Sequence, residues 1–124
     1  MTFLVCKGVV GLLIFDILGC GHDFGRLHGH VTKWNVAPSQ FSADIVQQVC
    51  RAINFACVWY PKRVLCLQRS AVTTCLLRSC GVPAEMVIGA QIVPFKAHAW
   101  TEVDGTVVNE RRPVNKFYHV LERC

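Results

Sequence analysis

A helix stop near the middle of the chain separates two segments with different hydrophobic patterns. Apolar side chains recur at helical spacing over residues 64–80, and the pattern ends there. Gly81 suits the left-handed backbone conformation that follows many helices, and Pro83 prevents the helix from continuing. The sequence therefore predicts a helix over 64–80 and a different kind of structure after it.

Short strands are expected after this stop. Residues 84–93 are rich in Val and Ile and indicate a buried strand, and residues 97–103 alternate as a second strand. Asp104-Gly105 is a strong two-residue hairpin signal, and the return strand begins at Thr106. Helices followed by a small antiparallel sheet make an α+β fold.

A second helix is predicted upstream of the first. Ser42 can cap its start, and Asp44 lies in its first turn. The apolar residues that then recur on one face are Ile45, Val49, Ala52, Ile53 and Ala56. We therefore divide the chain into an N-terminal apolar helix and loop, residues 1–41, and a single globular unit, residues 42–124. The tail predicts a short amphipathic piece through Val114, Phe117, Tyr118 and Leu121.

The N-terminal segment, residues 3–20, is strongly apolar. An export signal ending at Cys20 is one interpretation, but no positive charge precedes the apolar run and Lys7 interrupts it. The uninterrupted apolar stretch from Gly8 to Phe15 is far shorter than the roughly 20 residues that span a bilayer. We expect a buried or membrane-apposed helix, and membrane association is the alternative that we do not favour.

Composition excludes several function classes. With 124 residues, 52% hydrophobic and 17% charged, the chain can bury the core of one domain. The net charge of +5 comes from scattered basic residues, so we do not expect nucleic-acid binding. Most of the eight cysteines lie in apolar helical patterns, which fits reduced thiols in a cytoplasmic protein. No Cys-x-x-Cys occurs and the histidines have no standard ligand spacing, so we expect neither a metal nor a cofactor.

One cysteine stands out by its position. Cys66 lies at the start of a predicted helix, beside Lys62 and Arg63, whereas Cys75 and Cys80 lie near its middle and end. Backbone N–H groups at a helix N-terminus and nearby cations stabilise a thiolate, which is the nucleophilic form of cysteine. The sequence therefore indicates Cys66 as a nucleophile and the other two as packing residues.

A base for this thiol is expected on the strand over 97–103. Period-two alternation puts His98, Trp100 and Glu102 on one face of that strand. A cross-strand surface histidine is the simpler interpretation of His98. However, a helix N-terminal Cys followed by a His on a hairpin is the layout of papain-like and transglutaminase-like enzymes, and it favours a catalytic pair.

Several motifs occur together in the order Cys-Leu-x-Arg-Ser at 66–70, Gly-Val-Pro-Ala at 81–84, Val-Ile-Gly at 87–89, Phe-Lys-Ala-His-Ala-Trp at 95–100, Glu-Val-Asp-Gly at 102–105 and Val-Asn-Glu at 108–110. Together they closely resemble the transglutaminase-like cysteine peptidases of lasso-peptide biosynthesis, the B-type leader peptidases. The resemblance covers about residues 42–122. It implies a transglutaminase-like (papain-like) core in which Cys66 is the nucleophile and His98 the general base and acid.

The third catalytic residue is open between two neighbours. The family's acid, usually Asp after Val-Asn, falls on Glu110 in this chain. With a strict two-residue turn, Trp100 pairs with Asn109, which then shares the face of His98, while Glu110 points the other way. A bulge or a strand end before Glu110 reverses this, and Asn can also orient an imidazole. We take Glu110 as the third member and keep Asn109 as the alternative.

The resemblance implies that the chain removes the leader peptide from a ribosomally made lasso-peptide precursor by acyl-enzyme hydrolysis. Residues 1–41 leave no room for a leader-recognition element, so a separate recognition-element protein is an expected partner. An asparagine-synthetase-like lasso cyclase is another. The alternatives are a non-catalytic transglutaminase-like scaffold, and a transglutaminase or amidase that acts on another acyl substrate.

Overall fold

Helices occupy the first part of the described chain and strands the second. The computed structural model describes residues 2–17, 29, 31–33, 43–60, 66–92, 95–110, 114 and 118–124. The helices are α1 (Thr2–Ile17), α3 (Ala43–Trp59) and α4 (Cys66–Ser79). The strands are β1 (Ala84–Gln91), β2 (Lys96–Val103), β3 (Thr106–Val107) and β4 (His119–Arg123). This order confirms the α+β fold that the sequence predicts.

The strands of the described chain form one antiparallel four-stranded sheet in the order β3-β2-β1-β4. β1 and β2 pair over their whole lengths. β2 turns into β3 through Asp104 and Gly105, whose φ angles are 52° and 77°. A type I′ hairpin turn needs positive φ at both central residues. As the sequence predicts, Val103 pairs with Thr106 across this turn.

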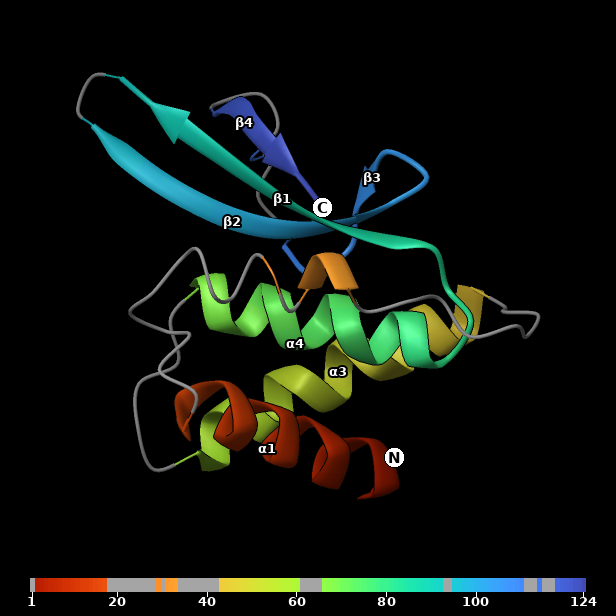
Figure 1. Ribbon diagram of the computed structural model, residues 1–124. Coiled ribbons are helices and arrows are strands. Elements are labelled where there is room, and N and C mark those ends of the chain that lie inside the picture. The colour runs from red at the N-terminus through yellow and green to blue at the C-terminus, as the bar shows by residue number, and fades with distance from the viewer. Residues whose placement is uncertain are drawn as a thin grey trace.

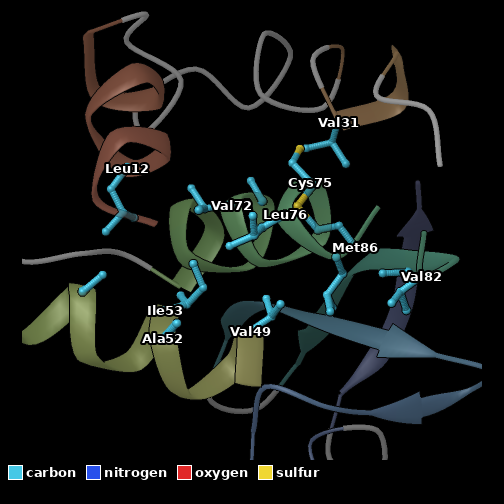
Figure 2. Close-up of a cluster of buried hydrophobic side chains, with 14 of the residues drawn as sticks. Leu12, Val31, Val49, Ala52, Ile53, Val72, Cys75, Leu76, Val82 and Met86 are labelled. Atoms are coloured by element: carbon cyan, nitrogen blue, oxygen red, sulfur yellow. The ribbon is translucent and has the colours of Figure 1, made fainter. Parts of the chain in front are cut away.

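Helix α4 lies between the sheet and helices α1 and α3 (Figure 1). It packs against β1 and β2 on one side and against α1 and α3 on the other. Every residue from Ser70 to Arg78 is buried as a result. Figure 2 shows the apolar cluster on the helical side, where Leu12, Ile53 and Val72 come from three different helices.

Polar side chains of α4 are buried together with the apolar ones, and they find partners. Gln68 Nε2 donates to Leu12 O at 2.9 Å. Arg78 donates from Nε to Ala84 O at 2.8 Å and from Nη1 to Val31 O at 2.6 Å. A buried polar group without a partner is costly, so these bonds are what allow a polar helix to occupy the centre of the fold.

The predicted helix stop is confirmed in detail. Gly81 has a φ of 85°. Its N–H donates to Arg78 O at 3.0 Å, and the Val82 N–H donates to Leu77 O at 3.0 Å. These two bonds make a Schellman motif, which satisfies the last carbonyl groups of the helix. The stop thereby directs the chain from α4 into β1.

Helix α1 is predominantly apolar, and only part of its described surface is covered. Leu12 is fully buried in the same cluster as residues of α3 and α4. In contrast, Val10, Leu13 and Ile14 are about half exposed, at 52%, 47% and 49%. No helix in the described part of the chain is long and apolar enough to cross a membrane. Ser42, the expected cap of α3, lies outside the described residues, and the division of the chain at residue 41 stays a prediction.

The C-terminal tail differs from the expected amphipathic piece. Its last residues form the edge strand β4, which pairs with β1. Val114 is buried against Trp100, whereas Leu121 is 65% exposed, so the two do not share an apolar face. Phe117 lies outside the described residues. The prediction was wrong on this point because pairing with β1 satisfies the backbone of the segment, and the apolar spacing does not reveal such pairing.

Arg78 offers a test of how the central helix is held. Arg78→Met removes the two donors that satisfy Ala84 O and Val31 O and leaves these buried acceptors unpaired. We expect the free energy of unfolding to fall by about 1–3 kcal/mol. Urea or thermal unfolding measures this. Arg51→Met, at an exposed position of α3, is the control and should change little. Equal stability of both variants would contradict the role given to Arg78.

Candidate active site

Three side chains from distant parts of the sequence meet at the N-terminal end of α4. Cys66 is the first residue of α4, His98 is the third of β2, and Glu110 follows the end of β3. The Cys66 thiol is hydrogen-bonded to the His98 ring. On the other side of that ring, Nε2 lies 2.5 Å from Glu110 Oε1. Because Glu110 occupies Nε2, Nδ1 is the ring nitrogen left for the thiol.

The site is largely withdrawn from solvent. The side chain of His98 is 12% exposed and that of Glu110 is 7% exposed. Cys66 is half-buried. Charges in such surroundings interact more strongly than they do in bulk water, so each contact has a larger effect on protonation.

The contacts shift protons from the thiol towards the imidazole. The hydrogen bond with His98 is the largest cause that lowers the pKa of Cys66, with further help from the backbone of Ala99 and opposition from burial. The same hydrogen bond is the largest cause that raises the pKa of His98, and Glu110 raises it further. Together these shifts favour a thiolate–imidazolium pair, which is the reactive form of a Cys-His couple.

Burial has the opposite effect on thiols that lack such a partner. It raises the pKa of Cys50 to about 11 and that of Cys75 to about 12. Cys75 is buried in the core, as expected of a packing residue. Lys62 and Arg63, which the sequence places beside Cys66, lie outside the described residues. Among the described residues, the largest cause of the lowered Cys66 pKa is therefore the histidine.

Glu110 rather than Asn109 contacts His98, because β3 ends early. The ladder between β2 and β3 stops at Val107, so the strict alternation that would put Asn109 beside His98 does not apply. Asn109 is engaged elsewhere: its Oδ1 accepts from Thr101 N at 2.8 Å, and its Nδ2 donates to Ser70 Oγ at 3.2 Å. The strand end before Glu110, one of the two exceptions considered from the sequence, is what the structure has.

Two aromatic rings pack around His98. The Trp100 ring lies nearly parallel to it at 6.1 Å between centroids, and the Tyr118 ring lies at 5.5 Å. Gly89, opposite His98 on β1, makes room for this packing. A Cβ at Gly89 would lie 2.6 Å from Trp100 Cη2, closer than carbon atoms approach one another.

A buried acid fixes Trp100 in turn. The indole Nε1 donates to Glu102 Oε2 at 2.7 Å. Glu102 is 4% exposed, and its other oxygen accepts from Arg123 Nη1 of β4 at 3.0 Å. A buried carboxylate requires such partners. His98, Trp100 and Glu102 thus share one face of β2, as predicted, and that face is held by the C-terminal strand.

No role in the site was predicted for Arg69, Ser70 or Tyr118, although Arg69 and Ser70 belong to the motif at 66–70. Arg69 and Ser70 follow Cys66 at spacings of three and four, which put them on the same helical face. That spacing is a usable signal. Nothing in the sequence indicates Tyr118, whose place depends on how β4 pairs with β1.

The histidine, cysteine and acidic side chains of the described chain do not gather in threes as a metal site would require. Every cysteine that the structure describes is a free thiol.

The reactivity of Cys66 can be tested without a substrate. At pH 6–7, we expect iodoacetamide to modify Cys66 faster than Cys6, although Cys6 is exposed, because only a thiolate reacts and His98 lowers the Cys66 pKa. Peptide-resolved mass spectrometry measures both rates. In His98→Ala the preference should disappear, and a preference that survives this change would mean that the histidine is not its cause.

Gly89 provides a test of the aromatic packing. Gly89→Ala forces the Trp100 ring to move, so we expect a loss of about 1–3 kcal/mol in the free energy of unfolding and slower modification of Cys66. Thermal unfolding and the alkylation assay measure the two effects. The matched control is Gly29→Ala, whose Cβ meets nothing within 4 Å. If Gly89→Ala behaved as this control does, the close approach of Trp100 would have no structural importance.

Comparison with known proteins agrees with this architecture. The model of one protein family, described as the transglutaminase-like superfamily, matches residues 24–123. No curated protein and no solved structure matches the chain. The matched span is most of the chain and includes Cys66, His98 and Glu110. On this evidence the chain belongs to the transglutaminase-like superfamily.

Proposed function

We propose that this protein is a cysteine peptidase that removes the leader peptide from a ribosomally made lasso-peptide precursor. The observation that supports the proposal best is the hydrogen-bonded series from the Cys66 thiol through His98 to Glu110. Acyl transfer from a peptide bond to a cysteine uses a thiol, an imidazole and an acid in this order. Membership of the transglutaminase-like superfamily agrees with that chemistry.

In the proposed reaction, His98 accepts the Cys66 proton, and the thiolate attacks the carbonyl carbon of the last leader residue. His98 then donates this proton to the leaving amine, which becomes the new N-terminus of the core peptide. Water, deprotonated by His98, next attacks the thioester, and departure of the thiolate releases the leader as a carboxylic acid. Glu110 holds the ring throughout, since it accepts from Nε2.

The start of α4 is suited to stabilising the oxyanion. The first N–H groups of a helix have no acceptor within the helix, and Cys66 is the first residue of α4. These donors and the positive end of the helix dipole lie where negative charge develops during attack on the carbonyl. We propose them as the oxyanion hole.

The substrate class and the partners follow from the motif resemblance. The motifs from Cys66 to Glu110 are those by which the chain resembles the leader peptidases of lasso-peptide biosynthesis. The proposed partners are accordingly the leader region of a precursor, a separate leader-recognition protein and an asparagine-synthetase-like cyclase. In this scheme the cyclase uses the amine that cleavage releases.

A cleavage assay tests the proposal. Wild type, Cys66→Ala and Cys75→Ala are each incubated with a lasso precursor peptide and the recognition-element protein, and mass spectrometry reports the products. We expect cleavage of one leader–core bond by wild type and Cys75→Ala, and none by Cys66→Ala. Cleavage by Cys66→Ala at the wild-type rate would show that another group is the nucleophile.

The same assay separates the alternatives. A product formed only with an added primary amine, in which that amine has replaced ammonia on a glutamine side chain, would indicate a transglutaminase instead of a peptidase. If wild type binds the recognition protein but leaves the precursor intact, the scaffold alternative is favoured over catalysis. Both outcomes contradict the proposed peptidase function.

A further inference from the structure

We propose that Arg69 is a positioning residue that holds Glu110 against His98. This inference rests on the proposed cysteine-peptidase chemistry, because it assigns a role in preparing the same Cys-His pair. Arg69 lies in the first turn of α4, three residues after Cys66, and Glu110 reaches it from the segment that follows β3.

Arg69 and His98 bind the same oxygen atom. Arg69 Nη2 lies 3.5 Å from Glu110 Oε1, the atom that His98 Nε2 contacts. The Arg69 side chain is 29% exposed, while the carboxylate it meets is 7% exposed. The guanidinium is therefore more exposed than the carboxylate and contacts the same oxygen as the imidazole.

In the described part of the chain, the other groups on which Arg69 acts carry no charge at neutral pH. Its guanidinium acts electrostatically on Cys50 and Cys57 of α3, but burial outweighs it and raises the pKa of both thiols, that of Cys50 to about 11. Both thiols are thus neutral at neutral pH. The buried Nε of Arg69 has no hydrogen-bond partner. Among the described residues, Glu110 is the acid that pairs with this cation.

Adjacent residues of α4 hold adjacent residues of the segment after β3. Ser70 Oγ accepts from Asn109 Nδ2 at 3.2 Å, and Arg69 pairs with Glu110. Ser70 also donates to Ala99 O at 3.0 Å, which ties it to β2 beside His98. Because a helix fixes the spacing between Cys66 and these two residues, one turn of α4 sets both the nucleophile and the acid.

Arg69 is expected to affect how the proton is shared between Cys66 and His98. When His98 takes the thiol proton, the imidazolium depends on Glu110 for stabilisation. Without Arg69, the carboxylate loses one of the partners that hold it against His98. A weaker contact between Glu110 and the imidazolium disfavours transfer of the thiol proton to His98, so the fraction of Cys66 in the thiolate form falls at a given pH.

The test compares Arg69→Gln and Arg69→Lys with wild type, with Arg51→Gln as a control at an exposed arginine of α3. The first readout is the pH profile of Cys66 alkylation, and the second is kcat for precursor cleavage. We expect Arg69→Gln to move the alkylation profile to higher pH and to lower kcat about tenfold. Arg69→Lys should recover a large part of both, and Arg51→Gln should behave as wild type.

A double-mutant cycle tests whether Arg69 acts on Cys66 through Glu110. In a Glu110→Gln background, Arg69→Gln should cause little further loss, because the contact that it breaks has already been weakened. Equal losses in both backgrounds, or an unchanged alkylation profile in Arg69→Gln, would overturn the proposal. If Arg69→Gln does not fold, Arg69→Met and Arg69→Lys give the same comparison of a neutral with a charged side chain.

These readouts also separate the inference from the proposed function. Alkylation of Cys66 needs no peptide substrate, so it reports on Arg69 even if wild type cleaves nothing. Failure of cleavage with a shifted alkylation profile refutes the proposed substrate and retains the role of Arg69. Normal cleavage by Arg69→Gln with an unshifted profile retains the peptidase and refutes the role of Arg69.

Discussion

The burial of α4 on both sides is the constraint on which the rest of the structure depends. The sheet covers one side of this helix, and α1 and α3 cover the other (Figure 1). A buried polar group is costly without a partner, and polar side chains of α4 are bonded to helix α1 and to two strands of the sheet. Gln68 is bonded to α1, Ser70 to β2 and Arg78 to β1. These bonds fix the helix along its axis, which apolar contacts alone do not do, because burial of apolar surface is not directional.

The candidate active site inherits its geometry from this fixed helix. Cys66 stands at one end of α4, and the Schellman motif at Gly81 closes the other. The histidine comes from the strand that packs directly on the helix, so thiol and imidazole are brought together by the same contacts that build the core. A rigid element is the best support for groups that must be placed accurately. The contacts that stabilise the fold therefore also position the side chains of the candidate active site.

The sequence predicts those features that local chemistry decides. The stop at Gly81 and the Asp104-Gly105 turn follow from backbone conformations that few residues tolerate, and both are present. Alternation along one strand was enough to place His98 on the face that it occupies. The choice between Asn109 and Glu110 could not be made in this way, because it depends on where a two-residue strand ends and on Ser70, which is 39 residues away. The burial of α4 could not be predicted either, because a polar helix is expected at the surface. Its buried polar groups are satisfied by tertiary partners that no local pattern reveals.

The tight turn between β2 and β3 has a consequence for how this family of sequences can vary. The turn sets the phase of the segment that carries Asn109 and Glu110, and these neighbours have different duties, one bonded to Ser70 and one to His98. Insertion or deletion of a single residue in the turn would shift both residues along β2 and break these two contacts. Substitutions at the exposed tip of the hairpin between β1 and β2 leave this phase untouched. Exchange of an exposed residue such as Ile92, at 73% exposure, therefore leaves the second hairpin unaltered, whereas a change in the length of that hairpin would disturb the site.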